Sequence, residues 1–342
     1  MFSKTDEPFE NKNRRYSCVN SLAMTKIKAQ KTITISARLV CALVVFSFSF
    51  FVFRSNAQIK SDDLQRLRLM QDSLKVLSDS VVTAKNPATR LQSSQAFIRT
   101  LVRALKVEGS YNFPFDSLKR IVILNAPDKK FRIFNWGTML ADGTYRYYGT
   151  VQMNDKKKLS MFPLVDFSDR IVNVDTATSH ERWYGALYYK IVQKKKYYYL
   201  FGWDGNDAES NKKLIDVMWF DSKGKPRFGA PHFVVSAGGR KRTVKRFIME
   251  YREEASVTLN YDPDSKMIVF DHLVPPSDNA AGMYAFYIPD GSYDAFEFKS
   301  GKWQHRDNIW RTTQDTPFPK PLDFEKETLS KPRSNNKKKS PK

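Results

Sequence analysis

Two consecutive glycines followed by three basic residues form the best candidate for an anion-binding site: Gly238, Gly239, Arg240, Lys241 and Arg242. Adjacent glycines let backbone N–H groups converge on an anion, and the basic side chains add charge-assisted hydrogen bonds. The alternative is a basic loop at the tip of a β-hairpin, whose charges only keep it solvated. The residues therefore predict either an anion-binding loop or a charged hairpin.

A loop rich in side-chain oxygen atoms is a weak candidate for a calcium site, with Asp204, Asn206, Asp207 and Glu209 as ligands. Calcium takes about six to eight oxygen ligands from a flexible loop. The spacing departs from the helix–loop–helix calcium pattern, because Ala208 stands where that pattern needs another ligand. A turn between two strands explains the same residues, so no metal site is predicted.

Signatures of common catalytic sites are missing from the sequence. It has no G-x-x-x-x-G-K-[ST] loop, no G-x-G-x-x-G opening a helix, no G-x-S-x-G and no H-E-x-x-H. His180, His232, His272 and His305 are far apart in the sequence, without the spacing of metal ligands, and each is interpreted as a structural or surface histidine. We predict no cofactor, and the catalytic residues, if the protein has any, stay unknown from the sequence.

Aromatic residues crowd two neighbouring segments: Trp183, Tyr184, Tyr188, Tyr189 and Tyr197 to Tyr199. In a strand these rings point to both faces, so one set must lie in the core. Rings on the other face could stack on sugars, with acids among Asp204, Asp207 and Glu181 doing glycan chemistry. Core packing and covering loops explain the same rings without a ligand.

The first 57 residues have the features of a secretory signal peptide with an extended n-region. An uncharged apolar run over residues 39–53 lies between Arg38 and Arg54, and a small-x-small motif predicts cleavage between Ala57 and Gln58. The alternative is an uncleaved membrane anchor, but such a span needs about 20 apolar residues. We therefore expect an exported protein, periplasmic or extracellular, that touches a membrane only through an uncleaved leader.

Removal of the leader changes both cysteine content and charge. Cys18 and Cys41 both lie in residues 1–57, so the mature chain would lack thiol catalysis, Cys-ligated metals and disulfides. The leader holds nine of the 57 basic and three of the 36 acidic residues, which leaves 48 against 33. Six more basic residues lie in residues 331–342, within a proline-rich tail (315–342) that is predicted to be disordered.

The elements that position these residues can be predicted from hydrophobic periodicity. Residues 58–108 form a helical segment, because apolar residues recur there at spacings of three and four: Leu64, Leu67, Met70, Leu74, Leu77 and Val81. Ser61 or Asp62 is expected to cap the start, and Asn86-Pro87 to separate two helices. We interpret this segment as a helical cap on a β domain, with a partner-binding coiled segment as the alternative.

From about Arg120 the period changes to two, within a β domain that is predicted over residues 109–314. Tyr145, Tyr147 and Val151 alternate with more polar residues, as expected for half-buried antiparallel strands. Asp142-Gly143 and Asp290-Gly291 predict tight hairpin turns. The fold class is therefore mainly β, an antiparallel meander that could be a sandwich, a partly closed barrel or an irregular propeller, preceded by the helical segment.

Several strand segments resemble those of a family of uncharacterised exported β-rich proteins from Gram-negative bacteria. The resemblance rests on FRIFNW (131–136), YRYYGTVQM (145–153) and FGWDGN (201–206), and it covers roughly residues 110–310. It implies export and a single β domain, and it brings no activity, cofactor or catalytic residue.

Export, basic clusters and missing catalytic signatures favour a non-enzymatic envelope or periplasmic protein of binding or structural type. Its expected partners are an anionic envelope polymer or another envelope protein, and no nucleic acid is expected. The alternative is a glycan-binding or glycan-hydrolysing protein that uses an aromatic-rich β surface.

Overall fold

Antiparallel strands dominate the fold, which confirms the predicted mainly β class. The computed structural model describes residues 59–155, 158–237 and 240–311. The described strands form three separate sheets and no closed barrel. The predicted leader with its cleavage position, the two glycines of the anion candidate and the predicted tail lie outside the described residues.

Two helices, α2 (Ser61–Thr83) and α3 (Pro87–Leu105), form the helical segment. The predicted break at Asn86-Pro87 is confirmed, and the side chain of Asn86 caps α3 by accepting a hydrogen bond from the backbone N–H of Ala88. The predicted cap of α2 is wrong. Ser61 and Asp62 both lie inside the helix, and Lys60 occupies the cap position without a side-chain hydrogen bond.

The strands are distributed over three sheets. The first contains, in order, β1 (Val122–Asn125), β2 (Phe131–Met139), β3 (Tyr145–Met153) and β4 (Met161–Val165). The second has the order β5 (Thr178–Ser179), β9 (Pro226–Phe228), β8 (Ser210–Phe220), β7 (Tyr197–Asp204) and β6 (Leu187–Lys194), and β12 (Arg246–Arg252) also pairs with β8. The third has the order β11 (Arg240–Val244), β10 (Phe233–Ala237), β16 (Lys302–Arg311), β15 (Ile288–Lys299), β14 (Met267–Val274) and β13 (Leu259–Asp262).

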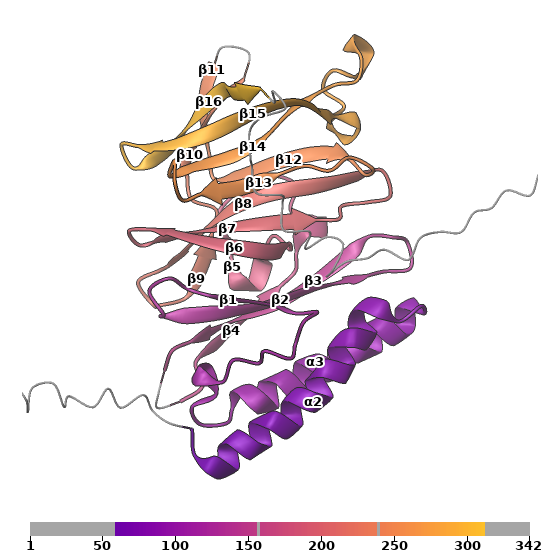
Figure 1. Ribbon diagram of the computed structural model, residues 1–342, viewed down its shortest axis with the longest axis vertical. Helices are drawn as coiled ribbons and strands as arrows, with labels where there is room; N and C mark the ends of the chain where they lie inside the picture. Colours follow the sequence, from indigo (N-terminus) through magenta and orange to yellow (C-terminus); the bar gives the residue numbers. More distant parts are fainter. Residues whose placement is uncertain (1–58, 156–157, 238–239, 312–342) are drawn as a thin grey trace, which may run out of the picture. The chain divides into compact units, whose positions relative to one another are not determined.

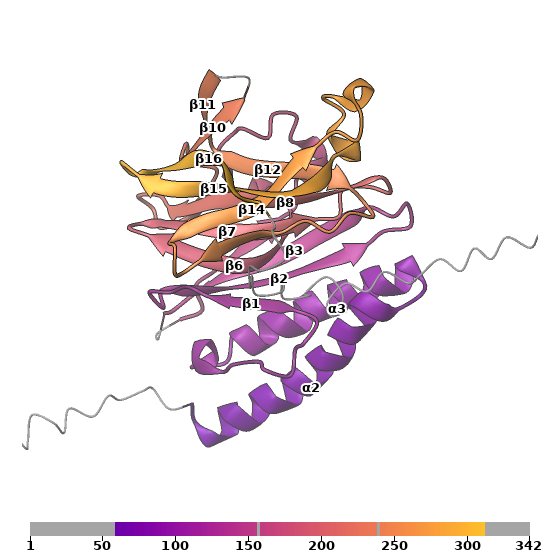
Figure 2. The same ribbon diagram turned by 45° about the horizontal axis from the view of Figure 1, so that its top comes forward.

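The helices cover one face of the first sheet, beside β2 (Figures 1 and 2). Leu67 and Leu74 of α2 and Phe97 of α3 are buried in one cluster with Phe134 and Trp136 of β2. The rings of Phe97 and Trp136 meet edge to face, with centroids 4.9 Å apart. The helical segment therefore buries its apolar stripe on the β region, as expected for a cap.

The second sheet is buried on both faces. Along β7, Tyr198 and Leu200 pack in a cluster with the first sheet, whereas Tyr199 and Phe201 pack in a cluster with the third. Successive side chains of a strand point to opposite faces, so a run of large residues fills two cores at once. Most of the aromatic residues singled out in the sequence are buried in these cores: Trp183, Tyr184, Tyr188, Tyr198 and Tyr199.

The third sheet packs its inner face against the second through Phe270, Phe296 and Trp303. Its strand order departs from a simple antiparallel meander, because β10 pairs with β16 in parallel through Phe233 and Val234. The hairpin of β10 and β11 thus extends the sheet beyond β16 (Figure 2), and β11 is an edge strand. Two interruptions of register in this sheet produce the candidate site.

Candidate functional site

The first interruption lies between β14 and β15. Asp271 pairs with Tyr293 and Leu273 with Pro289, so the single residue His272 faces the three residues 290–292. Such a bulge bends the strand and redirects side chains. The hairpin turn predicted at Asp290-Gly291 is therefore wrong, because both residues lie inside β15. The positive φ of Gly291, 84°, serves the bulge in place of a turn.

The second interruption lies between β15 and β16. Tyr293 pairs with Trp310 and Ala295 with Arg306, so Asp294 alone faces residues 307–309. Asn308 in this bulge has a φ of 51°, and its backbone N–H donates to Asp294 Oδ1 over 2.9 Å. Consecutive bulges in neighbouring strand pairs thus bring polar residues of β14, β15 and β16 to one place.

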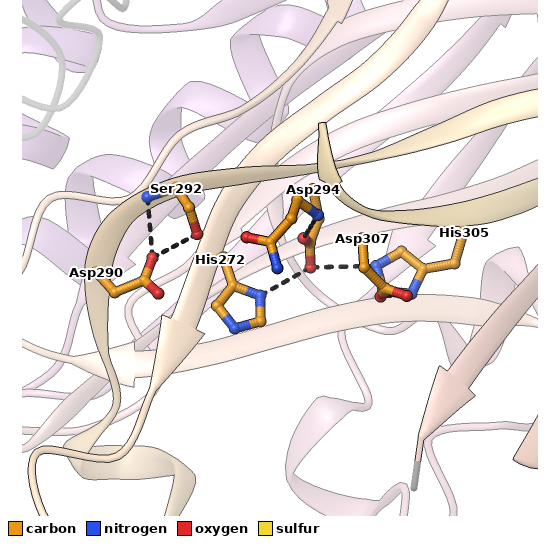
Figure 3. A network of polar contacts seen from close by, with 7 residues as sticks. His272, Asp290, Ser292, Asp294, His305 and Asp307 are labelled. Atoms are coloured by element: carbon orange, nitrogen blue, oxygen red, sulfur yellow. Dashed lines mark hydrogen bonds and ion pairs between the residues drawn. The ribbon is translucent and has the colours of Figure 1, made fainter. Parts of the chain in front are cut away.

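The Asp294 carboxylate is the centre of this cluster, with a histidine on either side (Figure 3). His272 Nδ1 lies 3.0 Å from Asp294 Oδ2, and His305 Nε2 lies 3.2 Å from the same oxygen atom. The side chain of Asp294 is 6% exposed, so its charge is held by these contacts and by the Asn308 N–H more than by water.

His305 connects Asp294 to a second acid. Its Nδ1 lies 3.2 Å from Asp307 Oδ1, and this buried nitrogen makes no hydrogen bond in that geometry. The imidazole ring stacks on Phe270, with centroids 5.7 Å apart and an interplanar angle of 14°. Packing therefore fixes the ring between a buried and an exposed carboxylate, and leaves one ring nitrogen for another partner.

The electrostatics of the cluster favour charge on Asp294. Burial raises the pKa of Asp294, but hydrogen bonds from His305 and His272 outweigh burial and lower this pKa to about 2. Burial lowers the pKa of His272, whereas the hydrogen bond to Asp294 and its negative charge raise that pKa above its ordinary value. The carboxylate is therefore ionised at neutral pH and attracts cations.

Chemically, the arrangement can pass a proton along its hydrogen bonds or hold a metal ion. Asp294, His305 and Asp307 each offer a ligand atom, and these atoms lie within 4.8 Å of one another. Sequence reasoning missed this cluster, because His272 and His305 are far apart in the chain and come together only through the register of three strands. The only local signal was Asp290-Gly291, which is equally compatible with a turn and a bulge.

The basic residues of the anion candidate lie on β11. Arg240, Lys241 and Arg242 are exposed, and among the described strands β11 pairs only with β10. Lys241 shares a small open pocket of about 130 Å³ with His305, lined also by Val234, Ser236, Gln304 and Arg306. The structure therefore brings the predicted basic strand to the side of the third sheet on which His305 lies.

The residues of the weak calcium candidate satisfy one another. The ammonium of Lys212 donates a hydrogen bond to Asn206 Oδ1 over 2.6 Å. This contact places a positive charge at an oxygen atom that a calcium ion would need as a ligand. Asp207 Oδ1 accepts hydrogen bonds from the backbone N–H groups of Glu209 and Ser210, both at 2.9 Å. These contacts are those of a closed turn between β7 and β8.

Asp204, another residue of that loop, points into the core. Its carboxylate accepts hydrogen bonds from the hydroxyls of Tyr147 and Tyr184, at 3.1 and 3.4 Å. Burial raises the pKa of Asp204. Among the acids of the glycan alternative, Asp204 is therefore enclosed, whereas Asp207 is bound in its own turn and Glu181 lies exposed in a short 3-10 helix.

No family model, curated protein or solved structure matches this chain. The resemblance to exported Gram-negative proteins therefore stays a prediction.

Proposed function

We propose that the protein is an exported, non-enzymatic envelope or periplasmic protein that binds anionic polymer through the basic strand β11. The proposal rests on the exposure of Arg240, Lys241 and Arg242 and on their lack of an acidic partner among the described residues. All three are exposed on an edge strand, and within the described part of the chain no acid pairs with any of them. Exposed cations at three consecutive positions attract a polyanion, and salt weakens that attraction.

A second explanation of these charges is protection of the sheet edge. Charged side chains on an edge strand prevent its pairing with another chain. The two explanations differ in outcome, because loss of edge protection would cause aggregation while loss of a binding site would weaken retention on polymer. The glycan alternative has less support, since Trp183, Tyr188 and Tyr199 are fully buried and offer no stacking surface.

The test is retention of the full chain on immobilised heparin and on dextran sulfate over a salt gradient. The variant R240S/K241S/R242S removes three charges from β11. The matched control K337S/K338S/K339S removes three charges from the C-terminal segment. We expect the β11 variant to elute at clearly lower salt than the wild type, and the control to elute close to it.

Two results would count against the proposal. Retention that does not change with salt would exclude an electrostatic site. If the β11 variant and the control lose the same amount of retention, then total charge, and no particular strand, governs binding. Aggregation of the β11 variant with unchanged retention of its soluble fraction would identify edge protection as the role of these residues.

A further inference from the structure

We propose that Asp294, His305 and Asp307 bind a divalent transition-metal ion, with Zn²⁺ as the probe. The three residues come from β15 and β16, and the bulge opposite Asp294 places Asp307 beside His305. This proposal is independent of polymer binding, since it uses none of the basic residues of β11.

The distances between the three residues are close to those that such an ion needs. Ligand bonds of about 2.0–2.2 Å at tetrahedral angles place neighbouring ligand atoms roughly 3.3 Å apart. His305 Nε2 lies 3.2 Å from Asp294 Oδ2, which matches that spacing. Asp307 Oδ1 lies 3.2 Å from the other ring nitrogen, Nδ1, and an ion binds only one nitrogen of an imidazole, so the exposed side chain of Asp307 has to turn toward Nε2. One donor atom of each residue already lies within 4.8 Å of the other two. One imidazole and two carboxylates would leave a coordination position for water or a ligand, as in many three-ligand zinc sites.

The surroundings supply the outer contacts that metal ligands usually have. His272 approaches Asp294 Oδ2 at 3.0 Å (Figure 3). The Asn308 N–H donates to the other carboxylate oxygen, so Asp294 is oriented from two sides. Phe270 stacks on the ring of His305 and restricts its rotation. Ligands held in advance lose little freedom when an ion binds.

The donor atoms also indicate the class of ion. Imidazole suits zinc, copper, iron and nickel, whereas calcium and magnesium prefer all-oxygen sites. Access is available from two sides, because Asp307 is 66% exposed and His305 lines the open pocket beside Lys241.

The experiment is calorimetric titration of the metal-free full chain with Zn²⁺, together with the absorption spectrum of the Co²⁺ form. The key variant is D307N, because Asp307 is exposed and its replacement leaves the core unchanged. D264N, which changes an exposed turn aspartate outside the cluster, is the matched control. We expect one ion per wild-type chain, affinity at least about tenfold weaker in D307N, and unchanged affinity in D264N.

Two further variants locate the ion within the cluster. H305Q should abolish binding, and H272Q should weaken it by about 10- to 100-fold through Asp294. Thermal unfolding of each variant without metal shows whether it is folded. A Co²⁺ spectrum dominated by thiolate bands would place the ion on Cys18 or Cys41 and overturn the proposal. Wild-type affinity in both D307N and H305Q would also overturn it, whatever the result of the polymer experiment.

Discussion

At the scale of single residues, two buried arginines are accommodated in different ways. Arg246 pairs with Asp216 at 3.0 Å, and both side chains are completely buried. Arg132 donates its hydrogen bonds to neutral acceptors: the side chain of Gln152 and the backbone carbonyls of Phe113 and Ser110. Burial lowers the pKa of Arg132 to about 10. Replacement of the two arginines should therefore leave different defects behind.

The first prediction concerns R246M, which leaves the carboxylate of Asp216 buried without its partner. Breaking a buried pair in this way costs about 3–5 kcal/mol of unfolding free energy. Burial already raises the pKa of Asp216, and without Arg246 it rises further. A group whose folded pKa is raised by burial is destabilising while ionised, so the cost should shrink as the pH falls and Asp216 takes up a proton.

Urea denaturation at about pH 8 and about pH 5 measures this dependence. R132M is the matched control, because it replaces another buried arginine but leaves only neutral acceptors unpaired. Its cost should stay nearly the same at the two pH values. If R246M loses the same unfolding free energy at both pH values, as R132M should, then Asp216 is not left ionised and unpaired.

At the scale of elements, the helices are part of the β fold and not an appended segment. The second prediction is that F97A destabilises the whole described fold by about 3–5 kcal/mol, because Phe97 is fully buried against Trp136. L69A, on the exposed side of α2, is the control and should change stability little. Helix content by circular dichroism and tryptophan fluorescence should fall together during denaturation. An earlier loss of helix in F97A would show that α2 and α3 unfold separately.

These elements differ in how far the sequence predicts them. The helices and the break at Asn86-Pro87 follow from local spacing, and the strands of residues 131–153 follow from alternation. Burial of both faces of β7 also had a local signal, since Tyr197 to Phe201 is an uninterrupted run of large side chains. The cluster around Asp294 had only the ambiguous Asp290-Gly291, because bulges are set by pairing between strands that no local pattern specifies.

At the scale of the whole molecule, the positive charge is distributed unequally along the chain. Residues 1–57, the predicted leader, hold nine basic and three acidic residues, and residues 331–342 hold six basic and no acidic ones. The remaining residues, 58–330, keep 42 basic against 33 acidic. In the part of the chain that the structure describes, no helix is both long and apolar enough to cross a membrane. The excess positive charge of residues 1–57 is present in the mature protein only if the predicted leader is not cleaved.

The third prediction is that the mature protein begins at Gln58. Signal peptidases require small residues at the last and third-last positions of the leader, here Ala57 and Ser55, and tolerate most residues between them. A57F should therefore block cleavage, whereas N56F, the same bulky replacement one position earlier, should not. N-terminal sequencing and intact mass of protein from the cell envelope distinguish the two forms. A wild-type product that retains residues 1–57 would contradict the leader and indicate an anchor.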